Sequence, residues 1–196
     1  MVAPSNILGT LCTPKRGVNC DTLEATILLG VELAREGREG RKIGTLFTIG
    51  DEQAVLRCSR LLILDPLLGH PDSAKRINDP NMRESVKELA QLDGAFVISN
   101  EGVVISACRH LNTTGEDLTL PLGLGSRHIA AASITKMTRT VAVVVSSSSV
   151  VRVFDDGVLA GEIIPELWML AHYRTHIAAP YSETTRDNLT IMSREE

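Results

Sequence analysis

Two short stretches of this 196-residue chain carry residue types that suit chemistry on phosphate groups. The first is Asp93-Gly94-Ala95, an acid followed by two small residues at the start of an apolar run. The second is residues 123–132, GLGSRHIAAA, in which two glycines precede Ser-Arg-His. One stretch offers a carboxylate, and the other offers backbone N–H groups, a hydroxyl, a guanidinium and an imidazole.

The glycine-rich stretch predicts an anion site at a helix N-terminus. A helix is expected to start at Ser126, where free N–H groups and the helix dipole favour an anion. Arg127 adds a planar donor for phosphate oxygens, and His128 adds a titratable donor or a metal ligand. The same residues equally fit a structural helix capped by Ser126, with an exposed arginine and a packed histidine. The spacing matches neither a P-loop nor a Rossmann fingerprint.

An acid combined with a phosphate site suggests phosphoryl or nucleotidyl transfer. That reaction needs a hydroxyl in line with phosphorus, positive charge on the leaving group and usually a divalent metal. Asp93 could deprotonate the hydroxyl or hold the metal. A Ser–His–Asp hydrolase is weaker, because no G-x-S-x-G elbow is present. The paired acids Glu116-Asp117 and Asp155-Asp156 fall in an expected loop and turn, where a solvated role suffices.

A β-hairpin is expected to position Asp93. The apolar runs Ala95–Ser99 and Val103–Cys108 flank a three-residue loop that ends in Gly102, which is typical of a hairpin. The helix before it is expected to start at Asn81, which has capping-box spacing to Glu84. This helix delivers the chain to Asp93.

The remaining periodicity predicts an α/β fold with a mixed central sheet flanked by helices on both faces. The expected helices begin at Asp21, in a capping box with Glu24, and at Ser126, and span Glu52–Arg57 and Glu166–Ile177; the expected strands are Lys42–Ile49, Val141–Val145 and Val150–Phe154. Residues 1–20 are expected to be an irregular segment, residues 21–180 the domain, and residues 181–196 a polar, frayed tail.

Composition excludes several classes of protein. The net charge is −4 and only six residues are aromatic, so no nucleic-acid surface is expected. No apolar stretch approaches the ~20 residues that span a membrane, and no signal peptide is evident. The four cysteines form no C-x-x-C pair, which favours a reducing, cytoplasmic setting over a zinc site.

The two stretches together resemble the signature motifs of the diadenylate cyclase family, in a form similar to its archaeal members. LDGAFVIS and LGSRHIAAASIT carry the resemblance. It extends to LEATILLGVELAREG and RKIGTLFTIGD before them, and to VVISACRHL and VAVVVSSSS between and after them. The resemblance covers about residues 21–170.

The resemblance implies that two ATP molecules are joined into cyclic di-AMP with release of two pyrophosphates, with Mn²⁺ or Mg²⁺, between two facing copies of the domain. By position, Asp93 would activate the 3′-hydroxyl of the opposing ATP and, with His128, help to hold the metal. The substrate-binding residues would be Gly94, Ala95, Leu111 (on adenine), Ser126, Arg127, His128, Ile129, Ala130 and Ser146.

Two departures from the family pattern leave an alternative open. The motif usually ends in Arg-His-Arg, and Ile129 stands at the third position, so one phosphate-binding cation is missing unless Lys136 or Arg139 replaces it. The serine loop also lacks the glutamates common in bacterial members. A non-catalytic sensor of ATP or cyclic di-AMP is therefore the second hypothesis, and a generic α/β interaction module is the third.

Overall fold

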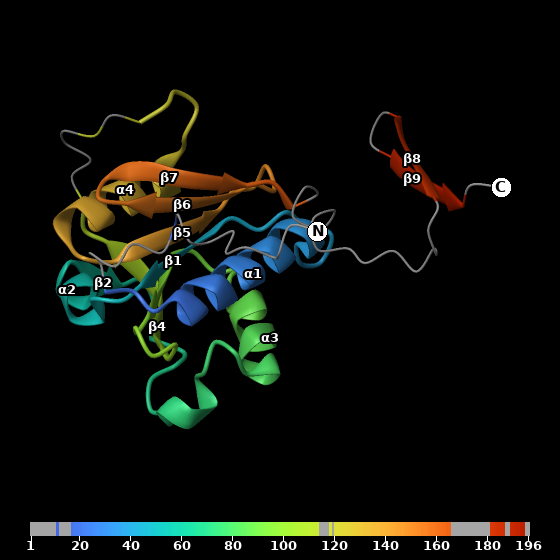
Figure 1. The fold of residues 1–196 in the computed structure, drawn as a ribbon. Coiled ribbons are helices and arrows are strands. Elements are labelled where there is room, and N and C mark those ends of the chain that lie inside the picture. Colours follow the sequence, from blue (N-terminus) through green and yellow to red (C-terminus); the bar gives the residue numbers. More distant parts are fainter. Residues whose placement is uncertain are drawn as a thin grey trace. The chain divides into compact units, whose positions relative to one another are not determined.

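The computed structural model describes residues 11, 17–113, 118, 120–165, 181–186 and 189–194. The chain divides into two compact units, Met1–Pro165 and Glu166–Glu196, and each is considered by itself. The first unit contains α1 (Cys20–Glu36), β1 (Thr45–Ile49), α2 (Glu52–Arg57), β2 (Ser59–Leu61), the 3₁₀ turn η2 (Asp72–Ala74), α3 (Pro80–Leu89), β3 (Ala95–Ile98), β4 (Val104–Leu111), α4 (Ser126–Met137), β5 (Val141–Val145), β6 (Val151–Asp155) and β7 (Val158–Ile163) (Figure 1).

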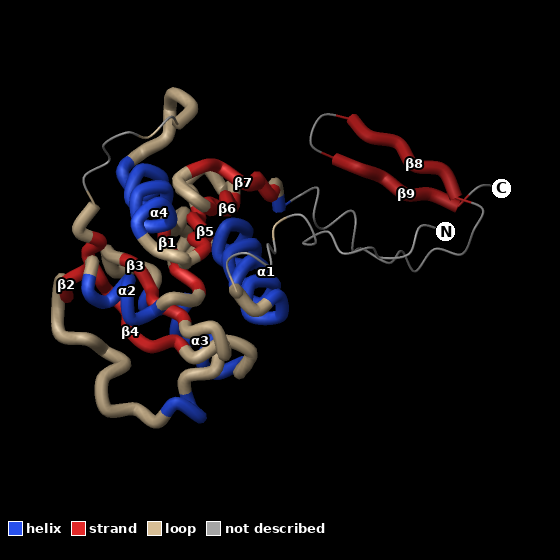
Figure 2. Tube along the Cα trace, turned by 60° about the vertical axis from the view of Figure 1, so that its left-hand side comes forward, coloured by secondary structure: helices blue, strands red, loops and turns tan. Residues whose placement is uncertain are grey.

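The first unit is built on one seven-stranded sheet in the order β2-β4-β3-β1-β5-β6-β7 (Figure 2). β1 and β3 are parallel, and every other neighbouring pair is antiparallel. The predicted mixed sheet is confirmed. The parallel pair lies at the centre, and the connection between its two strands contains α2, β2, η2 and α3.

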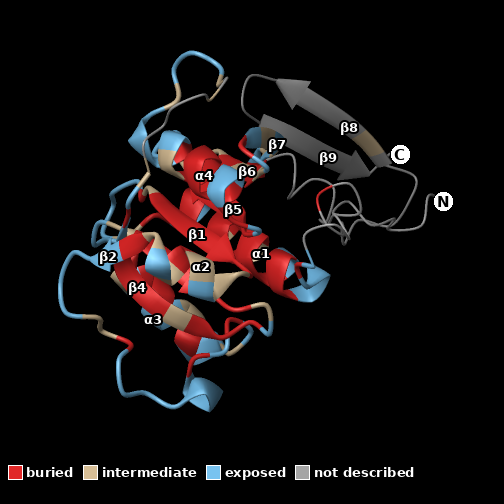
Figure 3. Cartoon of the chain, turned by 90° about the vertical axis from the view of Figure 1, so that its left-hand side faces the viewer, coloured by how far each residue is buried: buried red, intermediate tan, exposed pale blue. Residues whose placement is uncertain are grey.

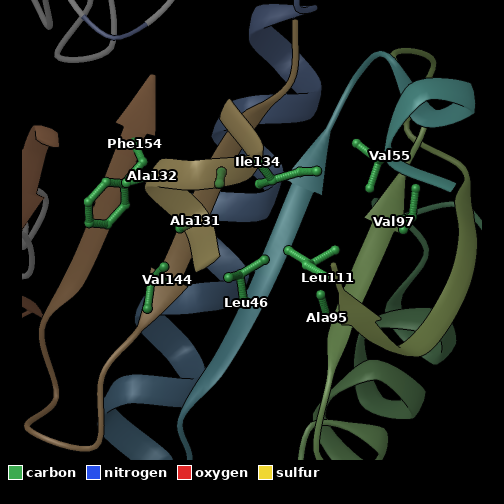
Figure 4. Packing of buried hydrophobic residues seen from close by; sticks show 11 residues of the cluster. Leu46, Val55, Ala95, Val97, Leu111, Ala131, Ala132, Ile134, Val144 and Phe154 are labelled. Carbon is green, nitrogen blue, oxygen red and sulfur yellow. The ribbon is translucent and has the colours of Figure 1, made fainter. Parts of the chain in front are cut away.

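Helices cover both faces of the sheet, as predicted. α1 packs on one face, where Gly30 lies close enough to Val145 and Val151 for an added Cβ to be 3.3 and 3.4 Å from their methyl groups. α4 packs on the other face, against residues such as Leu46 and Val144 (Figure 4). Successive residues of a strand point to opposite faces of the sheet. Val144 therefore packs against α4, and Val145 packs against α1.

The core is densest under α4. Its buried cluster combines small helix residues with branched strand residues: Ala131, Ala132 and Ile134 meet Leu46, Val144 and Phe154 (Figure 4). Alanines on this helix face let α4 approach the sheet closely, which is why the sequence places three of them together. Buried residues concentrate in the central strands and the helix faces turned toward them (Figure 3).

α2 (Glu52–Arg57) and α4 begin at the predicted residues, whereas α1 and α3 begin earlier than predicted. Asn19 caps α1 by accepting hydrogen bonds from the backbone N–H groups of Asp21 and Thr22. Asp79 caps α3 in the same way, with Pro80 as the first helical residue. The two predicted capping boxes are therefore wrong: the true caps lie two residues earlier, where Asn and Asp are also good acceptors.

The predicted hairpin is confirmed as β3 and β4, with Gly102 at φ +81° in its loop. β5 and β6 pair as predicted around the serine turn. The edge strand β7 was not predicted, because its sequence VLAGEI alternates weakly and contains a glycine.

The second unit contains two antiparallel strands, β8 (Tyr181–Arg186) and β9 (Leu189–Arg194). The expected frayed tail is therefore wrong for these residues, which carry β-favouring Thr, Tyr and Ile. The predicted helix Glu166–Ile177 lies outside the described residues.

The described cysteines differ in whether their thiol is free or disulfide-bonded. Cys58 and Cys108 are free thiols, whereas Cys20 is disulfide-bonded. Among the described residues, no helix has both the length and the apolar character required to cross a membrane.

Candidate active site

One end of the sheet collects residues that are distant in the sequence. Asp93 lies just before β3, and Ser146 follows β5. β1 lies between these strands and pairs Leu46 with Ala95 and Thr45 with Val145. Strands lie ~4.8 Å apart, so the backbones at Asp93 and Ser146 are roughly 10 Å apart along this end.

The N-terminus of α4 lies at this same end. The helix starts at Ser126, as predicted. Its N-cap is Gly125, which makes no side-chain capping bond, so Ser126 is not the capping residue. The first N–H groups of a helix have no partner within it. With no acidic residue in its first turn, α4 presents these groups and a positive dipole end to an incoming anion.

Arg127 extends from α4 across the start of β1 toward Asp93. A Cβ added to Gly44 would lie 3.0 Å from Arg127 Nη1, so the guanidinium rests on a backbone that has no side chain at that point. Its Nη2 is 3.3 Å from Asp93 Oδ1. The Asp93 side chain remains 80% exposed and that of Arg127 44% exposed, so the pair contributes at most about 1 kcal/mol.

Gly94 shows why glycine follows the acid. Its φ is +107°, and an added Cβ would lie 2.7 Å from both Arg109 N and Cys108 C of β4. The group that approaches this glycine is therefore the neighbouring strand, whereas the sequence suggested a ligand. Gly94 sets the path by which the chain leaves Asp93 and enters β3.

A cavity of about 370 Å³ opens beside these residues, a size typical of small-molecule sites. It brings together eight of the predicted residues: Asp93, Gly94, Ala95, Leu111, Ser126, Arg127, Ile129 and Ala130. Five further lining residues were missed: Leu46, Leu62, Arg109, His110 and Thr113.

The missed residues Arg109 and His110 had a usable signal. They immediately precede Leu111, which the sequence places in the site. The pairing of Arg109 with Ala95 depends on register shifts in the hairpin and had no local signal. Arg109 is held from behind, because its Nε donates to Ser59 Oγ at 2.8 Å and its Nη1 to Ser106 Oγ at 3.3 Å. It forms a fixed wall of the cavity.

His128 is not among the residues that line this cavity. It is buried against β6, with Nε2 3.2 Å from Arg152 Nη1 and its ring edge-on to Phe154 at 6.0 Å between centroids. Burial, and then the Arg152 guanidinium, lower the pKa of His128, while the Gly125 backbone acts in the opposite direction. A neutral, packed imidazole is the form that this environment favours.

The other predicted groups lie at two separate places. Ser146 is half-buried in the serine turn, and its Oγ is 2.8 Å from Ser148 Oγ. Lys136 and Arg139 lie at the opposite end of α4, where Arg139 N donates to Asp51 Oδ2. Since α4 rises ~1.5 Å per residue, Lys136 is about 15 Å from Ser126 along the helix axis, which rules out both residues as substitutes for the missing cation.

Comparison with known proteins gives concordant matches. A family model described as DisA bacterial checkpoint controller nucleotide-binding (DAC) matches residues 32–159. A diadenylate cyclase from Methanocaldococcus jannaschii is 49% identical over 145 residues, which cover 74% of this chain and 46% of that protein. A diadenylate cyclase from Haloferax volcanii is 39% identical over 153 residues, which cover 78% of this chain and 54% of that protein. The chain thus spans about half the length of these relatives.

A solved structure shows the same fold. It is a hypothetical membrane spanning protein from Bacillus cereus, with 18% sequence identity and a TM-score of 0.52. The match covers 71% of this chain and 62% of that one.

Proposed function

Since this chain belongs to the diadenylate cyclase (DAC) family, we propose that it condenses two ATP molecules into cyclic di-AMP and releases two pyrophosphates. The observation that supports this most is the juxtaposition in one cavity of an exposed carboxylate, an arginine and an uncapped helix N-terminus. An acid and an anion site are the two requirements of nucleotidyl transfer.

The cavity divides into parts that suit the parts of a nucleotide. Leu46 and Leu111 offer apolar surface to a base. Ser126 and Arg127 stand at the helix N-terminus, which suits the polyphosphate. The base would therefore lie toward β4 and the phosphates toward the start of α4.

Asp93 is the group that we assign to the reacting hydroxyl. Its carboxylate takes the proton as the 3′-oxygen of one ATP attacks the α-phosphorus of the other. The bond between the α-phosphorus and its bridging oxygen to the β-phosphorus breaks, and pyrophosphate leaves with the electron pair. Arg127 and the helix N–H groups stabilise the negative charge that develops on the phosphates.

A divalent metal fits this site as a companion of the nucleotide. Among the described residues, no three His, Cys, Asp or Glu side chains form a metal cluster. Mg²⁺ and similar ions often bind through one or two carboxylates plus substrate phosphates, and Asp93 would supply that carboxylate. The metal would add positive charge to the phosphates and the leaving group.

The reaction requires a second copy of the domain. Cyclic di-AMP has two phosphodiester bonds, each made by a separate hydroxyl attacking a separate phosphorus. One cavity holds one Asp93, so two facing cavities complete the ring. We therefore include a homodimer or larger assembly in the proposed function.

A nucleotide sensor is the second candidate, and one observation favours it. Ile129 lines the cavity with 42% of its surface exposed, at a position where the family pattern has arginine. A site with fewer cations can bind a nucleotide without stabilising the transition state enough for turnover.

One experiment separates the two functions. The chain is incubated with ATP and Mn²⁺ or Mg²⁺, and cyclic di-AMP is quantified by mass spectrometry. We expect product from the native chain and at least a 100-fold loss in Asp93→Asn, which retains ATP binding by calorimetry. ATP binding without any product would establish the sensor, and full activity in Asp93→Asn would remove Asp93 from the mechanism.

A further inference from the structure

The side chain of Asp65 joins the loop after β2 to strand β4. Its Oδ2 accepts a hydrogen bond from Ser106 Oγ at 2.5 Å. Its Oδ1 accepts from the backbone N–H groups of Leu67 at 2.9 Å and Ala107 at 3.4 Å. Ser106 is buried, and Asp65 is half-buried. A carboxylate with three donors of this kind is a fixed acceptor and not a solvated loop residue.

Asp65 binds β4 at the point where that strand is irregular. The register runs from Ala95 opposite Arg109 to Val97 opposite Ser106. Two steps along β3 therefore correspond to three along β4, which is a β-bulge. Cys108 within the bulge has φ +54°, a conformation that residues with a side chain rarely adopt. Such a conformation persists only when its surroundings hold it.

The bulge in turn supports the residue next to the proposed catalytic acid. Gly94 lies directly against Cys108 and Arg109, with 2.7 Å between its would-be Cβ and Arg109 N. Leu62 N also donates to Cys108 O at 3.0 Å, so the loop that carries Asp65 holds the bulge at two points. A change in the bulge would therefore move Gly94 and, with it, Asp93.

We infer that Asp65 is a positioning residue of the active site, which places Asp93 by holding the β4 bulge against Gly94. This inference rests on the proposed function for its catalytic consequence, but the structural link from Asp65 to Gly94 stands apart from it. Asp65 contacts neither substrate nor reacting atoms in this role. Its neighbour Ser106 shares the role, because its hydroxyl both donates to Asp65 and accepts from Arg109.

The test uses the full chain in two measurements. Asp65→Ala and Asp65→Asn are compared with Asp72→Ala, whose acid lies in the same connection but pairs with Lys75 at 3.1 Å. Asn keeps one oxygen acceptor, so we expect an intermediate effect. In steady-state kinetics, Asp65→Ala should lower kcat at least tenfold while changing KM for ATP less than threefold, and Asp72→Ala should match the native chain.

The second measurement is independent of activity. In ¹H–¹⁵N NMR spectra, the Gly94 and Arg109 amide signals should shift in Asp65→Ala and stay in place in Asp72→Ala. If the native chain makes no cyclic di-AMP, the proposed function fails and the amide shifts still decide the role of Asp65. The inference would be overturned if the Gly94 and Arg109 amide signals did not shift in Asp65→Ala. It would also be overturned if these signals shifted while kcat stayed unchanged. If Asp65→Ala does not fold, Ser106→Ala takes its place with the same expectations.

Discussion

The carboxylate of Asp93 and the guanidinium of Arg127 are in contact, 3.3 Å apart between Oδ1 and Nη2. These are the two groups that the proposed reaction assigns to different tasks, one to the hydroxyl and one to the phosphates. Both side chains are substantially exposed, so the pair is weak. A triphosphate with its multiple charges can displace the carboxylate from Arg127, which would free Asp93 only when substrate is present.

Arg127→Ala should weaken ATP binding. A charge-assisted hydrogen bond is worth roughly 1.5–3 kcal/mol, so the dissociation constant should rise about 10- to 100-fold. Calorimetry with ATP measures it directly. Arg139→Ala is the matched control, because Arg139 follows the far end of α4. This variant should bind ATP with the same affinity as the native chain. Equal losses in both variants would indicate a general electrostatic effect.

Ile129→Arg should strengthen the site. Ile129 already lines the cavity with 42% of its surface exposed, so a longer side chain can enter solvent without disturbing the core. One added cation beside the phosphates should lower KM for ATP several-fold, up to about tenfold. Ile129→Gln is the control of similar polarity without charge. An unchanged KM in Ile129→Arg would show that the phosphates do not reach this turn of α4.

Gly94→Ala should destabilise the fold far more than Gly123→Ala. Both glycines have positive φ, +107° and +91°, but an added Cβ meets the β4 backbone at Gly94 and nothing within 4 Å at Gly123. The Gly123 variant carries only the conformational cost, about 1 kcal/mol, whereas the Gly94 variant adds a backbone clash and should lose at least ~2 kcal/mol. Urea unfolding of both variants measures the difference. Similar urea midpoints for the two variants would mean that the β4 backbone at the bulge moves to accommodate the added methyl group at little cost.

The stability of the fold should depend on His128 below neutral pH. Burial and Arg152 lower its pKa from 6.5. The unfolded chain therefore binds a proton here more readily than the folded chain does. The free energy of unfolding should fall as pH drops through 6.5, by at most about 1.4 kcal/mol per pH unit, and level off below the folded pKa.

His128→Gln should remove this part of the pH dependence, measured as the free energy of unfolding between pH 7 and pH 5. His70→Gln, from an exposed loop, should retain it. An identical pH profile in the native chain and in His128→Gln would contradict the placement of His128 against Arg152.

Most of the site was predictable because it follows from local patterns. The hairpin signal around Gly102 placed Asp93 at a strand start, and the glycines before Ser126 placed a helix N-terminus. Both are features of consecutive residues, and both are confirmed. The resemblance then grouped them into one site, and the cavity contains eight of the residues it named.

What escaped prediction depends on contacts between distant residues. The side of α4 on which His128 lies is set by packing against Phe154 of β6, which no local pattern encodes. The role of Gly94 depends on a bulge fourteen to fifteen residues later, at Cys108 and Arg109. The capping residues Asn19 and Asp79 were missed for a simpler reason, since neighbouring Asp21 and Asn81 are equally good caps by residue type.

The hairpin that holds the Gly94 bulge and the helix that carries Arg127 depend on contacts of very different range along the chain. Asp93 is positioned by a hairpin whose strands are adjacent in the chain, a local contact that forms at low entropic cost. Arg127 is carried by α4, which packs on β1 and β5, a strand pair that joins Leu46 to Val144 across nearly one hundred residues. Local opening of the α4 side would thus remove the phosphate-binding half while the acid keeps its geometry, so ATP affinity should be lost before the hairpin unfolds.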